Sequence, residues 1–195
     1  MIHAFHFENG KISCMGGSCK IPADIILVDA TGKGIVPGLI DLHGHFLSGK
    51  ARDIEQSLPA MIWDQLRFLP SVRRELIAAG ITSYRSLGDV MPAIFTLKKE
   101  LNQQNIAGPR LFVSGPIFTI KGGHPTQKKG IPNWVLESMT IQSDDPTYVK
   151  QQIAILAKQG IDGVKVVYQS HTNSEGVVTM PRISNETLQA ITDEA

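Results

Sequence analysis

The stretch "GLIDLHGHFLSGK", residues 38–50, closes an apolar run with two histidines that a single glycine separates. In a strand, side chains two positions apart point to the same face of the sheet, so His43 and His45 would direct two imidazoles to one side. Imidazole is a good ligand for zinc and neighbouring transition metals. By itself the H-x-H pattern fits a structural or surface pair equally well. The stretch therefore predicts a candidate metal-binding pair at the end of a strand.

The same stretch permits a second interpretation, because Gly44 to Lys50 has the G-x-x-x-x-G-K spacing of a phosphate-binding loop. That loop needs a Ser or Thr hydroxyl for Mg²⁺ directly after the lysine, and this chain has Ala51 there. His45 and Phe46 would also crowd a loop that should offer bare backbone N–H groups. A P-loop-like nucleotide binder is thus a remote alternative.

Composition restricts the class of protein. The chain has 195 residues, of which 42% are hydrophobic and 19% charged, and its formal charge is +1. These values allow a packed core in one large or two small domains. Acids and bases are mixed along the chain, so neither nucleic acid nor a membrane surface is an expected partner. No apolar run approaches the ~20 residues of a membrane helix.

The two cysteines, Cys14 and Cys19, are too few for a secreted disulfide scaffold. We interpret them as reduced thiols, with half of a zinc site as the sharper alternative. The first residues, "MIHAFHFENG", lack the basic region and long apolar stretch of a signal peptide. Together these features predict a soluble, cytoplasmic protein.

Residues 1–36 have the pattern of a small β module. An apolar alternation turns at Asn9-Gly10, which is the strongest short hairpin signal. The run "DIILVDATGKGIVPGLIDLH", residues 24–43, predicts two more strands, which a glycine-rich break at 31–34 separates.

After residue 37, helical patterns alternate with short β-rich runs. The pairs are "SVRRELIAAG" with "ITSYRSL", "AIFTLKKELNQQ" with "RLFVSG", and "PTYVKQQIAILAKQG" with "IDGVKVVY". This alternation is typical of βαβ units on a parallel sheet, so the predicted class is α/β.

Local signals place some boundaries within this part. Asp145 can cap a helix that starts at Pro146 and stops before Gly160. Pro70 predicts a kink or a fresh helix start. Residues 116–144 are expected to form a long loop, and such loops are usually functional or mobile.

Four segments, in chain order, resemble the amidohydrolase superfamily. "IVPGLIDLHGH" (35–45) closely resembles its entry motif, P-G-[LF]-[IV]-D-x-H-x-H. "AAGITSYRSLGD" (78–89), "GPRLFVSGPIFTIKGGHP" (108–125) and "GIDGVKVV" (160–167) resemble its second, third and fourth barrel strands. The resemblance is nearest to the imidazolonepropionase- and prolidase-related branches. It implies a partial TIM-like barrel of about the first four βα units, residues 37–195. Residues 1–36 would then be part of a composite β-sandwich.

The resemblance also implies a chemistry, namely metal-dependent hydrolysis of C–N bonds in amides, cyclic amides or dipeptide-like small molecules. His43 and His45 would bind one divalent metal, with zinc preferred, and the site would hold one or two ions. Lys165 would be the bridging ligand after carboxylation by CO₂, because a free ammonium cannot bind a cation. The alternative for Lys165 is a lysine that extends from a strand end to solvent.

Three more residues are candidates around this centre. His124, in "KGGHP", is either a substrate contact or an ordinary loop histidine. Arg85 could pair with a substrate carboxylate or form a structural ion pair. It lies five residues after Gly80, as Lys165 does after Gly160, so the two hold equivalent places on their strands. Asp41 is expected to support the histidines rather than to bind metal.

The family pattern has further metal-binding histidines and a catalytic aspartate on later barrel strands, which this sequence does not contain. We therefore expect the N-terminal portion of an amidohydrolase, weakly active or inactive alone. The rival from another class is a non-catalytic half-barrel protein that acts by assembly or binding. Because half a barrel leaves open strand edges, we also expect self-association.

Overall fold

The computed structural model describes residues 4–20, 22–47, 58–128 and 130–195, and the side chains of the first helix from residue 67 onward. The chain separates into two compact units, Met1–Pro37 and Gly38–Ala195. Within the described ranges, no helix is long and apolar enough to cross a membrane.

The first unit contains the expected hairpin, formed by β1 (Phe5–Glu8) and β2 (Lys11–Met15). Both turn residues, Asn9 and Gly10, have positive φ angles of 51° and 73°. Such a turn matches the right-handed twist of the two strands, which is why Asn-Gly is favoured there. The hairpin prediction is therefore confirmed.

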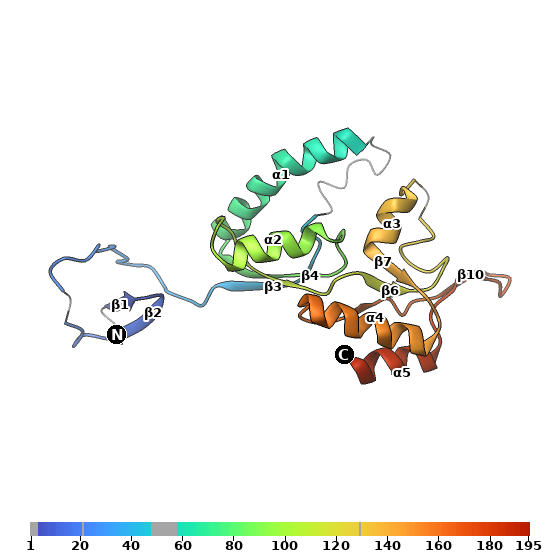
Figure 1. The fold of residues 1–195 in the computed structure, drawn as a ribbon. Helices are drawn as coiled ribbons and strands as arrows, with labels where there is room; N and C mark the ends of the chain where they lie inside the picture. Colours follow the sequence, from blue (N-terminus) through green and yellow to red (C-terminus); the bar gives the residue numbers. More distant parts are fainter. Residues whose placement is uncertain (1–3, 21, 48–57, 129) are drawn as a thin grey trace. The chain divides into compact units, whose positions relative to one another are not determined.

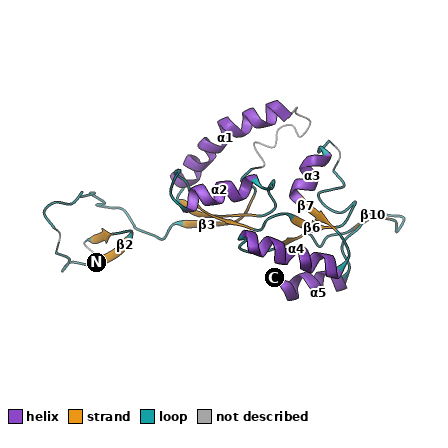
Figure 2. Cartoon of the chain, in the orientation of Figure 1, coloured by secondary structure: helices purple, strands orange, loops and turns teal. Residues whose placement is uncertain are grey.

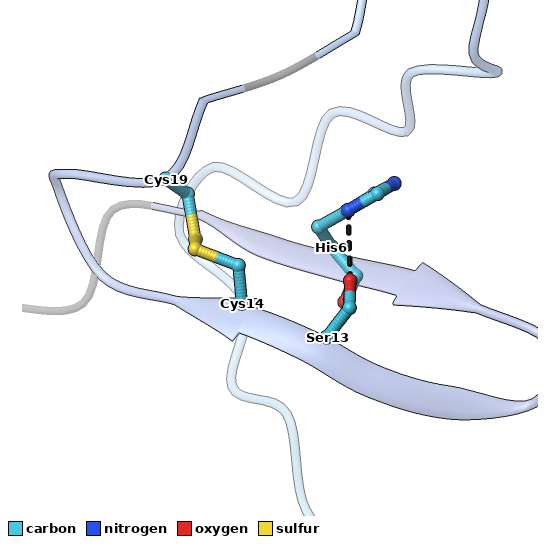
Figure 3. The surroundings of a disulfide bond; sticks show 4 residues. All are labelled: His6, Ser13, Cys14 and Cys19. Carbon is cyan, nitrogen blue, oxygen red and sulfur yellow. Dashed lines mark hydrogen bonds between the residues drawn. A yellow bond between two sulfur atoms is a disulfide. The ribbon is translucent and has the colours of Figure 1, made fainter.

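Close to this hairpin, the two cysteines are joined. Figure 3 shows the Cys14–Cys19 disulfide beside a hydrogen bond of 2.8 Å between the Ser13 hydroxyl and Nδ1 of His6. The expectation of reduced thiols differs from this structure, as does that of half a zinc site, because sulfurs bonded to each other are not thiolate ligands. The five-residue separation of the cysteines lets the chain turn back after β2 and bring them together.

One predicted strand of the first unit is wrong. No strand occurs between residues 22 and 38, and the apolar side chains of Ile26 and Val28 are 92% and 78% exposed. The run has the composition of a buried strand. A strand exists only where its backbone pairs with a neighbour, however, and the described part of this unit offers none to it.

The second unit is α/β with parallel sheets (Figures 1 and 2), as predicted. Its parallel strands are β3 (Leu39–Gly44), β4 (Ile81–Ser86), β5 (Arg110–Val113), β6 (Ile117–Thr119), β7 (Thr140–Gln142) and β8 (Lys165–Val166). Its helices are α1 (Leu58–Ala78), α2 (Ala93–Asn102), α3 (Asn133–Met139), α4 (Pro146–Gln159) and α5 (Asn185–Glu194). A short antiparallel pair, β9 (His171–Thr172) and β10 (Val178–Met180), precedes α5.

The described parallel strands form two sheets of three strands each. Their orders are β3-β4-β5 and β7-β6-β8. Helix α1 lies between the paired strands β3 and β4, α2 between β4 and β5, and α3 between β6 and β7, which is the crossover that parallel pairing requires. Helix α4 lies between β7 and β8, which flank β6 on opposite sides.

Helix α4 shows why its boundaries were predictable. The Asp145 carboxylate accepts hydrogen bonds from the backbone N–H groups of Thr147 (2.8 Å) and Tyr148 (3.2 Å) at the start of the helix. At the other end Gly160 adopts the left-handed conformation with φ 89°. Both caps satisfy backbone groups that a helix end leaves unpaired, as expected.

Two other local predictions need correction. Helix α1 runs as one element through Pro70, so the fresh helix start there is wrong, and the alternative of a kink at Pro70 stays a prediction. The expected long loop at 116–144 contains β6, α3 and β7. These elements are only three to seven residues long, which is too short for hydrophobic periodicity to reveal them.

The buried side chains form two clusters. The first lies between β4, β5 and the helices α1 and α2, and consists of Phe46, Tyr84, Ile94, Leu101, Leu111 and Val113. The second joins β6 to α4 and α5, which lie beside each other in Figure 1, and consists of Phe118, Val149, Ile153, Leu156, Ile183, Ala190 and Ile191. Each large aliphatic or aromatic side chain contributes about 1.5–3 kcal/mol on burial.

Asp162 connects the turn before β8 to helix α2 and to β5. Asp162, in the turn before β8, accepts from Nζ of Lys98 at 2.7 Å and from the backbone N–H of Val113 at 2.8 Å. Its own backbone N–H donates to the Val113 carbonyl, also at 2.8 Å. Through these bonds β8, and with it Lys165, is connected to the end of β5.

Candidate metal and substrate site

The two histidines of the opening motif lie next to each other where β3 ends. Their ring centroids are 6.0 Å apart with an interplanar angle of 66°, and both side chains are exposed. The carboxylate of Asp41 accepts the backbone N–H of His43 at 3.0 Å. Asp41 therefore holds the backbone of β3 at His43, and its role in supporting the two imidazoles stays a prediction.

Glycine is required between these histidines. A Cβ atom on Gly44 would overlap the hydroxyl of Tyr84, which comes from the neighbouring strand β4. The Tyr84 ring is buried and packs edge-to-face on Phe46, with centroids 5.2 Å apart, so it has little freedom to move. Tight packing on this side of β3 thus explains the H-G-H spacing.

Burial raises the pKa of Tyr84 to about 12, and the carboxylates of Asp41 and Asp89 act in the same direction. A backbone hydrogen bond from His45 opposes them. Tyr84 consequently keeps its proton at neutral pH.

Asp89 ties the segment after His45 to the turn after β4. Its buried carboxylate accepts hydrogen bonds from the backbone N–H of Phe46 (2.7 Å) and of Leu47 (3.2 Å), and from the hydroxyl of Ser86. Burial raises the pKa of Asp89, while these hydrogen bonds and the charge of His45 oppose that rise. The carboxylate fixes the backbone that follows His45.

The sequence reasoning missed Asp89. Its two backbone partners are 43 and 42 residues away, and a lone aspartate after "SLG" looks like an ordinary turn residue. The sequence shows only Gly88 before it; the structure adds that this glycine has φ 94° and that a Cβ on it would overlap Ile117. A glycine with those properties marks a tightly packed turn.

Arg85 lies beside the histidine strand. Its Nε donates to the backbone carbonyl of Leu42 at 2.8 Å, and its side chain is exposed. The structural alternative for Arg85 was an ion pair, and the structure gives it a backbone carbonyl instead. Its role toward a substrate stays a prediction.

The electrostatic surroundings of His124 include Lys165 and His45. Lys165 begins β8 and stands opposite Ile117 of β6, whereas His124 lies in the loop after β6. Burial lowers the pKa of His124, and the charges of Lys128, Lys165 and His45 lower it further. Two other predicted site residues, Lys165 and His45, thus act electrostatically on His124.

The donor set fits a divalent ion only in part. A catalytic zinc usually has three protein ligands, and the described residues contain no group of three His, Cys, Asp or Glu side chains that could hold a metal. His43 and His45 offer two imidazole groups as nitrogen ligands. Lys165 becomes an oxygen ligand only if its amine is carboxylated, because an ammonium group has no lone pair to give.

The described backbone does not support the alternative of a phosphate-binding loop. Its residues 48–51 lie outside the described part of the chain. Of the preceding backbone amides, those of Phe46 and Leu47 already donate to the Asp89 carboxylate. Amides that are bonded to a carboxylate do not form an anion-binding cradle.

The known proteins that are similar to this chain agree with the resemblance that its sequence motifs indicated. No family model matches the chain. A dihydroorotase from Pelobacter propionicus is 31% identical over 87 residues, which are 45% of this chain and 18% of that protein. A solved amidohydrolase structure matches with a TM-score of 0.72 at 24% identity, over 97% of this chain and 48% of its own.

Two prolidase structures are also similar. A putative prolidase from Bifidobacterium longum matches with a TM-score of 0.67 at 26% identity, over 95% of this chain and 39% of its own. A prolidase solved with N-methylphosphonate-L-proline matches with a TM-score of 0.71 at 20% identity, over 94% and 46%.

The chain thus spans less than half the length of these structures. Its resemblance to the amidohydrolase superfamily and its prolidase-related branch, predicted from the sequence, is confirmed.

Proposed function

We propose, from the premise that this chain shares the fold of the amidohydrolases and prolidases, that it is the N-terminal part of a metal-dependent hydrolase of C–N bonds. The observation that carries the proposal is the pair of exposed imidazoles at the end of β3, together with the charges of Lys165 and His45 that act on His124. In an α/β barrel, active sites lie at the ends of the strands where such side chains collect.

The architecture we infer is an N-terminal β module, residues 1–36, followed by the first half of a (β/α)₈ barrel, residues 37–195. The parallel order β3-β4-β5 and the parallel pairing of β6 with β8 support about four βα units. The first unit would be part of a composite β-sandwich.

The ion would be zinc, one or two per site, held in part by His43 and His45. A carbamate on Lys165 would add an anionic oxygen ligand. When bound, such an ion lowers the pKa of water and polarises a scissile carbonyl. The substrate class is a small amide, cyclic amide or dipeptide-like molecule, and the prolidase structures favour the last.

The chain's own residues would position these groups. Asp89 and Tyr84 fix the backbone around the two histidines, so that the imidazoles keep their separation without a ligand. Arg85 is held against β3 by its Nε, which leaves the outer nitrogens of its guanidinium for a substrate carboxylate. His124 would contact the substrate from the loop after β6.

With only two histidines and Lys165 as ligands, the 195-residue chain should bind Zn²⁺ weakly and hydrolyse amides poorly or not at all. The test is a calorimetric Zn²⁺ titration of the chain and of the His43→Ala/His45→Ala variant. We expect weak binding that the double substitution abolishes. His171→Ala is the matched control, because His171 is exposed on β9, and it should bind as the parent chain does.

Equal Zn²⁺ binding by the parent and the double variant would refute the site. Robust metal-dependent turnover of a dipeptide or cyclic amide by this chain would instead refute its weak activity.

A second function, assembly as a non-catalytic half-barrel, is favoured by the open side of β3. Among the described strands β3 pairs only with β4, and Leu39, Ile40 and Leu42 are exposed. Unpaired strand edges with apolar side chains promote association, so the chain should form homo-oligomers or aggregate.

A cytoplasmic location stays a prediction, against which the Cys14–Cys19 disulfide argues.

A further inference from the structure

The loop that carries His124 is fixed by its own hydrogen bonds. The buried hydroxyl of Thr119 donates to the His124 carbonyl at 2.9 Å. The Thr126 hydroxyl accepts the backbone N–H of Gly122 and donates to the Gly123 carbonyl, each at 2.8 Å. The backbone on both sides of His124 is therefore held in place, and its ring starts from a defined position.

The ring in turn contacts a neighbouring amide. Nδ1 of His124 lies 3.2 Å from the side-chain amide of Gln127. With the amide nitrogen toward the ring, the amide oxygen faces only other acceptors. With the amide turned over, its oxygen accepts from Nδ1, and its nitrogen donates to the carbonyls of Gly123 (3.1 Å) and Pro125 (3.3 Å). Only the second orientation satisfies both ends of the amide.

We propose that Gln127 is a positioning residue that holds neutral His124 in the tautomer with its proton on Nδ1. Two backbone carbonyls orient the amide oxygen toward the ring, and an oxygen can only accept. The hydrogen bond at one ring nitrogen determines the state of the other, so Nε2 is left as a lone-pair acceptor.

The surrounding charges support a neutral ring. Burial lowers the pKa of His124, and the positive charges of Lys128, Lys165 and His45 act in the same direction. Within the described part of the chain, no hydrogen bond engages Nε2 of His124. That nitrogen is therefore available to a ligand as an acceptor.

This inference rests on the proposed function in one respect, the assignment of His124 as a substrate contact. A neutral imidazole with a bare Nε2 accepts a hydrogen bond and cannot donate one. His124 would then select a hydrogen-bond donor of the substrate, such as an amide N–H or an ammonium group. It would not select a carboxylate, which needs a donor.

The test is nitrogen NMR of the metal-free 195-residue chain with ¹⁵N-labelled histidine, in which His124→Gln identifies the His124 signals. Above the His124 pKa, we expect Nδ1 to be protonated and Nε2 bare. Gln127→Leu removes the acceptor, so the tautomer should shift toward Nε2–H. Gln127→Glu places a carboxylate at Nδ1 and should raise the His124 pKa by about one unit.

Gln151→Leu, an exposed glutamine on α4, is the matched control and should leave the His124 signals unchanged. The proposal is overturned if the parent chain shows Nε2–H, or if neither Gln127 substitution alters the tautomer or the pKa of His124. Because no metal or substrate is present, this outcome is independent of the Zn²⁺ titration that tests the function.

Discussion

Strands β6 and β3 belong to the same unit and are both apolar and parallel, yet their environments are opposite. β6 pairs with β7 on one side and β8 on the other, and Ile117, Phe118 and Thr119 are all buried. β3 pairs only with β4 among the described strands, and its Leu39, Ile40 and Leu42 are 58%, 61% and 58% exposed. Burial of a strand is thus determined by its neighbours, and apolar composition alone does not provide it.

The candidate site lies at the end of the less buried strand. Burial of β3 itself therefore cannot explain why the two histidines have a fixed arrangement. It comes from Gly44 against Tyr84 and from the Asp89 carboxylate, which connect the end of β3 to β4. The site depends on a few specific contacts, whereas β6 depends on a hydrophobic cluster.

Substitution of one large side chain on each strand should show the largest difference between β6 and β3 in the free energy of unfolding. Phe118→Ala opens a cavity in the cluster of β6, α4 and α5 and should lower the free energy of unfolding by about 3–5 kcal/mol. Leu42→Ala on β3 removes an exposed side chain and should change it by no more than about 0.5 kcal/mol. Urea unfolding of both variants measures this. Equal losses would mean that β3 is as buried as β6.

The glycine between the histidines should show an intermediate effect. Gly44→Ala forces its new methyl group against Tyr84 and should cost about 1–3 kcal/mol. Gly163→Ala is the control, since a Cβ there meets no atom within 4 Å. Adding Tyr84→Phe removes the overlapped hydroxyl and should recover part of the loss. If the double variant is no more stable than Gly44→Ala, the packing explanation fails.

The smallest expected effect is a pH dependence from Asp89. Burial raises its pKa in the folded chain, so between the ordinary value of 3.8 and the folded pKa the folded state binds more protons than the unfolded state. The stability from this group is therefore full at low pH and decreases as pH rises through that window. Unfolding of the parent chain and of Asp89→Asn across this range should show the slope only in the parent. The same slope in both would assign it to another group.

Local rules were sufficient for part of this structure. The Asn9-Gly10 turn and the Asp145 and Gly160 caps each act over a few residues, so single sequence windows predicted them. The H-x-H pattern placed two rings together because strand periodicity is also local.

Long-range contacts were not accessible in this way. Asp89 is joined to backbone groups more than forty residues away, and no window contains both partners. Residues 24–30 had the pattern of a strand, but whether a strand forms depends on a neighbour that the pattern does not specify. Gln127 and His124 are close in sequence, yet which of them donates the hydrogen bond depends on the orientation of the Gln127 amide, which the sequence does not show.

The central claim is that β3 has no second neighbour among the described strands, and hydrogen–deuterium exchange of the 195-residue chain at two concentrations tests it most directly. In dilute solution, β6 amides should exchange far more slowly than those of β3. At high concentration, self-association through the open edge should slow exchange in β3 and leave β6 unchanged. If β3 is as protected as β6 in dilute solution, with no dependence on concentration, the claim is contradicted.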